Sequence, residues 1–201
     1  MVAIMGFEKV TLRIIDGAEA KLDENVFVIN GKKDGGGTAS VKISGLAVDP
    51  VKTFASNKPY HISGKGVGDA KADFDIVDLP EKIQNAILGL EPDDDGIVTA
   101  TSDTEAPDVA VLIEDTDIRG NRVMLGFSTG KFAFDGTEMS TGQGKAEELT
   151  PETLSYTIGA NDAGEYYKRY IGKEEASKTA LLKALGMDFS TPATTTTTIE
   201  A

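Results

Sequence analysis

Short segments in which apolar and polar residues alternate follow one another along the chain, and glycines separate many of them. In residues 7–15, for example, Val10, Leu12 and Ile14 occupy every second position. Side chains of a strand point alternately to the two faces of a sheet, so this spacing predicts strands with one buried and one solvated face. Nine further segments are predicted strands by the same pattern: residues 26–30, 39–46, 60–63, 71–77, 97–101, 109–114, 122–127, 131–134 and 153–158.

Two other segments repeat their apolar residues with the period of an α-helix. Residues 80–90 begin with a proline near the first helical position, and residues 174–185 have two glutamates at their start and Gly186 just beyond their end. Many strands and few helices predict a mainly β (α+β) fold. We expect a β-sandwich or partly open barrel with one flanking helix, plus a short C-terminal helix.

The length and composition favour one domain. The chain has 201 residues, of which 40% are hydrophobic and 26% charged, as in an ordinary globular protein. Residues 190–201 include five consecutive threonines and almost nothing to bury. We therefore predict a single β domain over residues 1–189 and a Thr-rich flexible tail over residues 190–201.

The negative charge of the chain is concentrated in one segment. The net charge is −13, and residues 69–117 contain fifteen acidic residues against Lys71 and Lys82, so the rest is balanced. This charge argues against binding nucleic acid through its phosphates. The segment is either a solvated face that keeps the protein soluble, or a surface that faces an anionic molecule without binding it. Within it, Asp73 and Asp75 alternate with apolar residues, which predicts one buried and one wet face.

The usual signatures of catalysis and of cofactor binding are weak. The chain has no cysteine, which excludes disulfides, thiolate zinc sites and cysteine nucleophiles. The single histidine, His61, has Ser63 on the same predicted strand face but lacks the surroundings of a catalytic serine. The glycines of residues 64–69 have the wrong spacing for a phosphate-binding loop. We predict no enzyme activity and no cofactor.

Metal binding and membrane insertion are also not expected. Residues 91–96 place acidic side chains as an EF-hand loop does, but the twelfth position is Ser102, so a charged turn is the better interpretation. The longest apolar run, residues 109–113, is far shorter than the ~20 residues of a membrane helix. The first residues lack the basic start of a signal peptide.

Four blocks of the sequence resemble a known family as an ordered set. They are GFEKVTLRIID (6–16), GKGVGDAKADFDIVDLPEKIQNAILG (64–89), SDTEAPDVAVLIED (102–115) and VMLGFSTGKFAFDG (123–136). They resemble the major tail proteins, or tail tube proteins, of those siphophages (phages with long non-contractile tails) that infect Gram-positive bacteria. The fold of such tubes is similar to that of type VI secretion tube proteins.

The resemblance implies a structural subunit of the virion rather than an enzyme. Six copies would close a hexameric ring, and stacked rings would form the tail tube through which double-stranded DNA passes without specific binding. Expected partners are other copies of the chain, a tape-measure protein, and tail terminator and initiator proteins. Assembly would take place in the host cytoplasm.

Two sets of residues are candidates for this role. Asp73 and Asp75 are candidate lumen-facing residues, because a wall with the same charge as the cargo opposes adhesion over a screening distance of ~8 Å. The second set is a glycine-rich segment that we predict to be a mobile loop for contacts between rings. It consists of Gly31, Lys32, Lys33, Asp34, Gly35, Gly36 and Gly37.

Two alternatives remain open from the residues alone. A calcium-dependent or carbohydrate-binding β-sandwich module would explain the short strands and acidic loops, although the chain has no tryptophan for stacking on sugars. A small hydrolase that uses His61 or a pair of carboxylates would need a nucleophile, a base and an orienting group, and no such set is visible.

Overall fold

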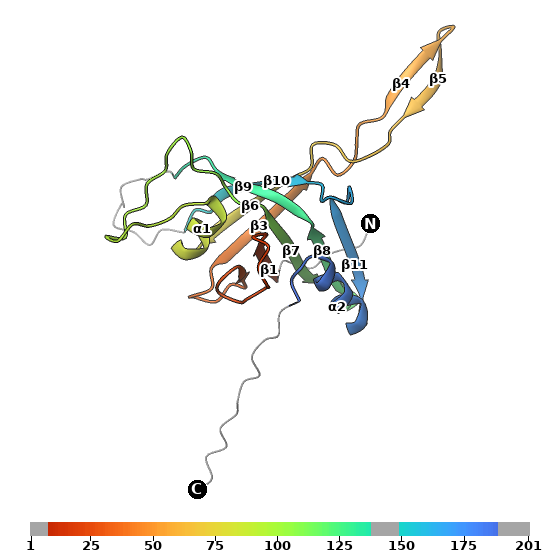
Figure 1. Cartoon of the computed structure of the whole chain (residues 1–201). Helices are drawn as coiled ribbons and strands as arrows, with labels where there is room; N and C mark the ends of the chain where they lie inside the picture. The colour runs from red at the N-terminus through yellow and green to blue at the C-terminus, as the bar shows by residue number, and fades with distance from the viewer. Residues whose placement is uncertain (1–7, 138–148, 189–201) are drawn as a thin grey trace.

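Two antiparallel sheets pack face to face in the computed structural model, which describes residues 8–137 and 149–188 (Figure 1). The five-stranded sheet has the order β11-β8-β7-β1-β2, and the four-stranded sheet has the order β3-β6-β10-β9. Strands β4 and β5 form a separate hairpin. The strands are β1 (Lys9–Ile14), β2 (Val26–Ile29), β3 (Gly37–Ser44), β4 (Val51–Ala55), β5 (Lys58–Ser63), β6 (Lys71–Asp78), β7 (Val109–Thr116), β8 (Arg122–Phe127), β9 (Thr129–Phe134), β10 (Glu152–Gly159) and β11 (Tyr167–Gly172).

The main core lies between the two sheets and is held by aromatic side chains. The ring of Tyr156 lies 4.7 Å from that of Phe132 and 6.1 Å from that of Phe127, centroid to centroid. The Tyr156 hydroxyl donates a hydrogen bond of 2.6 Å to the backbone carbonyl of Val109, on the opposite sheet. Burial raises the pKa of Tyr156 well above its usual range, so the hydroxyl stays protonated as a donor.

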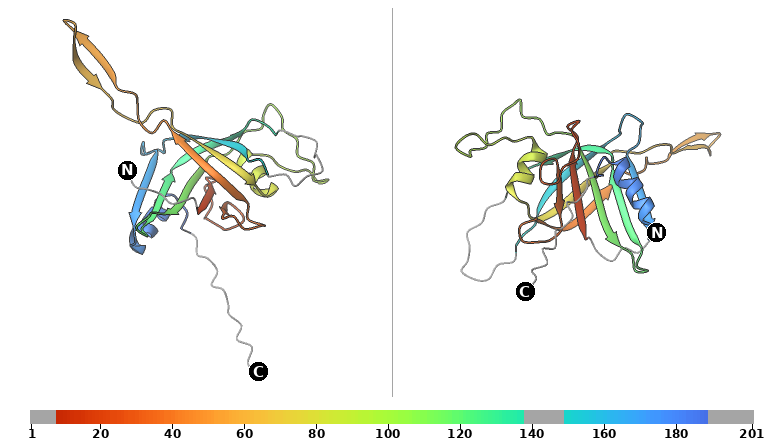
Figure 2. Two further views of the ribbon diagram at one scale, coloured as in Figure 1. Left: turned by 180° about the vertical axis from the view of Figure 1, so that it is seen from behind. Right: turned by 60° about the horizontal axis from the view of Figure 1, so that its bottom comes forward.

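The two helices cover different parts of the sandwich. Helix α1 (Glu81–Leu88) lies beside β9 and buries Ile83 and Ile87 in the main core. Helix α2 (Glu175–Ala184) packs on the outer face of the five-stranded sheet, where Leu181 and the following Leu185 contact a second apolar cluster (Figure 2). Both helices therefore form because each has an apolar stripe to bury.

The mainly β fold class expected from the sequence is confirmed. Of the two predicted forms, a β-sandwich and a partly open barrel, the structure is the sandwich. Nine of the ten predicted strands are present. The strand predicted at residues 97–101 is wrong: Val98 makes only an isolated bridge with Pro92, and the side chain of Ile97 is exposed. The sequence analysis missed β4 and β11. The predicted tail, residues 190–201, lies outside the described residues.

The hydrogen bond between the sheets gives a stability prediction. Tyr156→Phe removes the donor but keeps the ring, so we expect the free energy of unfolding to fall by about 1 kcal/mol in urea titrations. The control is Tyr167→Phe, at an exposed position of β11, where a change within about 0.5 kcal/mol is expected. Equal stability of the parent and Tyr156→Phe would show that this bond does not tie the sheets together.

Candidate assembly surfaces

One face of the four-stranded sheet is covered by the other sheet, and the opposite face is polar. On β6, Ala72, Phe74 and Ile76 are buried, while Asp73 and Asp75 between them are half-buried on the polar face. The alternation predicted from the sequence is therefore present. Whether this face lines a channel stays a prediction.

Neighbouring strands hold both carboxylates in place. Asp75 accepts hydrogen bonds from the hydroxyls of Ser40 on β3 and Thr153 on β10. Asp73 accepts a bond of 2.9 Å from the Ser155 hydroxyl and lies 3.5 Å from the ammonium of Lys71. These contacts fix the carboxylates against the sheet.

The polar face carries charges of both signs. The pairing of strands places Lys42, Asp73, Ser155 and Ala133 in one row that crosses the sheet from edge to edge. Lys71 and Lys131 both pair with Thr157, so they lie in the next row on the same polar face. The face is therefore mixed in charge rather than uniformly acidic.

The acidic segment at residues 69–117 does not form a single surface. Glu114 is only 2% exposed and is paired with Lys9 and, at 3.2 Å, with Arg122 on the five-stranded sheet. Asp117 is also buried, and hydrogen bonds from the side chain and backbone of Asn121 lower its pKa. Part of the negative charge is thus buried and paired within the fold instead of facing solvent.

The glycine-rich segment forms a turn with internal hydrogen bonds between β2 and β3. The amide of Gly31 donates to the carbonyl of Gly36, and that of Gly35 donates to the carbonyl of Lys32. Lys32, Lys33 and Asp34 are exposed at its tip, whereas Gly36 is buried. The base of this turn is thus fixed, and its role between rings stays a prediction.

The most prominent surface feature is the β4–β5 hairpin, of which the sequence analysis predicted only the strand at residues 60–63, in β5. It projects away from the sandwich in every view (Figures 1 and 2). Its tip is a two-residue turn in which Ser56 and Asn57 both have positive φ, at 51° and 62°, as a type I′ turn requires. Asn57 followed by the Tyr-His-Ile-Ser strand is the signal that could have located it.

The hairpin exposes large apolar side chains. Val51, Phe54, Tyr60 and Ile62 are between 58% and 80% exposed. A two-stranded hairpin is marginally stable alone, and a group of exposed apolar residues usually marks an interface. His61 and Ser63, considered above as catalytic candidates, also lie on this exposed hairpin.

The four-stranded sheet ends in two edges, formed by β3 and β9. Among the described residues, each of these strands pairs with one other strand only. On β9, Lys131 forms an ion pair with Glu105, which raises the pKa of Lys131 and lowers that of Glu105. The unpaired backbone groups of both edges are available to another chain.

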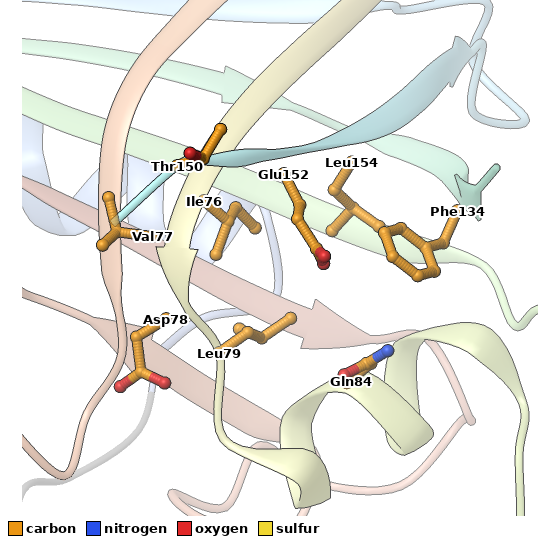
Figure 3. A pocket seen from close by; sticks show the side chains of 9 residues that line it. All are labelled: Ile76, Val77, Asp78, Leu79, Gln84, Phe134, Thr150, Glu152 and Leu154. Carbon is orange, nitrogen blue, oxygen red and sulfur yellow. The ribbon is translucent and has the colours of Figure 1, made fainter. Parts of the chain in front are cut away.

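A pocket of about 300 Å³ opens where β6 passes into α1 (Figure 3). Its apolar lining includes side chains from three strands of the sheet, and two carboxylates lie among them, with that of Glu152 pointing into the pocket. Its lining residues include Val77, Asp78, Leu79, Phe134, Glu152 and Leu154. The hairpin lies at the end of the four-stranded sheet where β3 ends and β6 begins (Figure 1), and the pocket lies at the other end, where β6 ends.

The acidic turn at residues 91–96 uses its carboxylates for its own geometry. The Asp93 side chain accepts hydrogen bonds from the amides of Asp95 and Ile97. In residues 8–137 and 149–188, no group of three or more acidic or histidine side chains is arranged to hold a metal ion. None of the helices described there is long and apolar enough to cross a membrane.

Comparison with known protein families identifies the family to which the chain belongs. A model of the phage tail tube protein family matches residues 2–193, nearly the whole chain. The chain therefore belongs to the phage tail tube protein family, as the resemblance implied, and is a structural component of a phage tail. A search of curated proteins finds no match.

The glycine-rich turn gives a second stability prediction. Gly36 has a φ of +75°, and a Cβ there would lie 2.9 Å from Cδ of Pro80 and 3.0 Å from the carbonyl oxygen of Asp78. Gly31 has nearly the same φ, +72°, but open space around it. Gly31→Ala should cost about 1 kcal/mol of unfolding free energy from backbone strain alone. Gly36→Ala should cost more, because its Cβ also clashes.

Thermal and urea unfolding of the two variants measure this difference. Equal losses for Gly31→Ala and Gly36→Ala would mean that the base of the turn is not packed against Pro80.

Proposed function

We propose that the chain forms closed hexameric rings in which β9 of one copy pairs with β3 of the next, and that stacked rings form the tube for DNA delivery. Membership of the tail tube family supports a role in the tube. The observation that carries the ring geometry is the pair of unpaired edges on one four-stranded sheet.

The directions of the strands suit a head-to-tail ring. All three pairings in the sheet are antiparallel, so its first strand, β3, and its last, β9, run in opposite directions. When β9 meets β3 of an identically oriented neighbour, the antiparallel alternation continues across the junction. A head-to-tail contact whose rotation closes gives a ring and leaves no free edge.

In this proposal the polar face of the four-stranded sheet lines the channel, with Asp73 and Asp75 on the inner wall. The burial of the opposite face by the five-stranded sheet supports this choice, because it leaves the polar face open. Two of the lysines of this face, Lys71 and Lys131, are paired with Asp73 and Glu105, which leaves DNA phosphates few free cationic sites to bind. DNA would therefore pass without specific binding.

The remaining partners follow from the role in the tail. Tape-measure, terminator and initiator proteins would set the length and the ends of the tube, and assembly would take place in the cytoplasm of a Gram-positive host. The protein would act as a structural component with no catalytic step.

Cross-linking tests the ring directly, because the chain has no cysteine of its own. Lys42 on β3 and Ala133 on β9 lie in one row, three strand spacings or roughly 14 Å apart within a copy. In the ring, β9 of one copy, which carries Ala133→Cys, would lie beside β3 of the next copy, which carries Lys42→Cys. Treating the double variant with a short bismaleimide should therefore give a ladder of covalent oligomers that ends at the hexamer.

Each single variant is the matched control and should give no ladder, because like edges do not meet. Ser40→Cys and Ser44→Cys, also on β3, cover the other registers. Rings or tubes without a ladder in any register would contradict pairing of these edges, and a ladder that ends elsewhere would correct the copy number.

Charge reversal tests the inner wall. Asp73→Lys with Asp75→Lys adds cations to the proposed channel, so we expect tubes to assemble while DNA delivery, measured as infectivity, falls strongly. The control is Asp94→Lys with Asp95→Lys, which makes the same charge change in the exposed acidic turn and should leave infectivity near that of the parent. Normal infectivity of the Asp73/Asp75 variant would refute the assignment.

A further inference from the structure

An apolar groove of about 590 Å³ lies between β3 and the inner face of the five-stranded sheet. On one side it is lined by residues of β3 and the turn after it, and on the other side by residues of β7 and β8. The apolar lining residues are Val41, Ile43 and Leu46 on the first side and Ile113, Val123 and Leu125 on the second. A continuous apolar surface of this kind usually marks a binding site.

The groove reaches the edge of β3 at which the backbone is unpaired. Ser40, on the polar face of the strand, and Val41, on the inner face, both line the groove, so it extends around this edge. In the described part of the chain, β3 pairs with β6 only. An extended segment bound here would therefore gain main-chain hydrogen bonds as well as apolar contacts, as in strand addition.

The described chain begins at one end of this groove. The amide of Glu8 donates a hydrogen bond of 3.2 Å to the carbonyl of Glu114, and the next residue, Asp115, lines the groove. Glu8 also lines a small pocket together with Thr38, the second residue of β3. The residues that precede Glu8 therefore leave from a point between β7 and the start of β3.

Residues 1–7, here called the N-terminal segment, have the composition and the length to fill the groove. Their sequence, Met-Val-Ala-Ile-Met-Gly-Phe, contains no charged or polar side chain. Seven extended residues reach ~23 Å, and β3 from Thr38 to Ser44 spans ~20 Å. A segment that leaves from the start of β3 and follows the strand to its end runs in the opposite direction, which is the antiparallel arrangement.

We propose that the N-terminal segment of the unassembled chain lies along β3 as an added antiparallel strand over this groove, and that β9 of a neighbouring copy replaces it when a ring closes. The replacement step rests on the proposed function, because it requires the β3–β9 pairing. The segment would protect an exposed edge from pairing before assembly. Only chains in which the segment has left β3 would be competent to join a ring.

Pairs of cysteines test where the segment lies in the unassembled chain. In Ile4→Cys with Lys42→Cys, a short bismaleimide should join the two thiols within single chains, at a concentration below that of assembly. Ala3→Cys and Met5→Cys, each with Lys42→Cys, cover the neighbouring registers. The matched control is Ile4→Cys with Ala133→Cys, because β9 lies at the other edge, roughly 14 Å from β3, and no link within a chain is expected.

The reactivity of the groove provides an independent readout. Ile4→Asp with Met5→Asp puts a carboxylate on each face of the segment, so one of them opposes burial in any register. Tyr167→Cys, on the groove wall, should then react with a maleimide roughly fivefold faster or more than in the parent background. Ile97→Cys, at a position 61% exposed, is the control and should react equally in both backgrounds.

Closing the segment chemically tests its effect on assembly. Chains in which a reducible bismaleimide joins Ile4→Cys to Lys42→Cys should form no rings, and reduction of the linker should restore them. Each single variant, treated with the same reagent, should assemble like the parent.

The outcomes separate this inference from the proposed function. No link in any of the three registers, a link that forms only between chains, or equal reactivity of Tyr167→Cys in both backgrounds would overturn the position of the segment and leave the tube role standing. Linked chains that assemble as readily as the parent would overturn the replacement step. The β3–β9 pairing is read separately, from the ladder between Lys42→Cys and Ala133→Cys in rings.

Discussion

Backbone hydrogen bonding at the edges of the four-stranded sheet is the constraint on which the proposed assembly depends. A strand at an edge leaves a row of amides and carbonyls without partners, and such a row is a template for pairing with another chain. In this protein β3 and β9 form two such edges on the same sheet. Because β3 and β9 run in opposite directions, pairing of these two edges between neighbouring copies of the proposed ring would satisfy both rows of backbone groups.

The amphipathic character of that sheet links the fold to the channel. Alternation along β6 buries Phe74 toward the five-stranded sheet and leaves Asp73 and Asp75 on the opposite face. The carboxylates are anchored by hydroxyls of neighbouring strands, such as that of Ser155. In the proposed channel, such a wall would present its polar groups in fixed positions, so its interaction with DNA would depend on the summed charge of the face rather than on single mobile side chains.

Sequence patterns located the elements whose side chains face the core. The buried stripe of α1, and the alternation in β1 and β6, are visible because burial imposes their periods. The strands of the β4–β5 hairpin are exposed along their whole length, so burial imposes no such period on them, and only residues 60–63 were predicted as a strand. In β11, Tyr167, Lys168, Arg169 and Tyr170 form an edge strand without apolar alternation. The error at residues 97–101 is the converse: apolar residues follow a turn held by Asp93, but no sheet lies beside them.

The same distinction explains why candidate residues for assembly are hard to find in a sequence. Core residues are constrained by contacts within one chain, whereas Phe54 and Tyr60 on the hairpin are exposed, so burial imposes no pattern on them. A tube needs two kinds of head-to-tail contact, one whose rotation closes and one that advances along an axis. In the proposed ring, the β3 and β9 edges at the sides of the four-stranded sheet make the contact that closes, so contacts between stacked rings would come from other surfaces of the subunit.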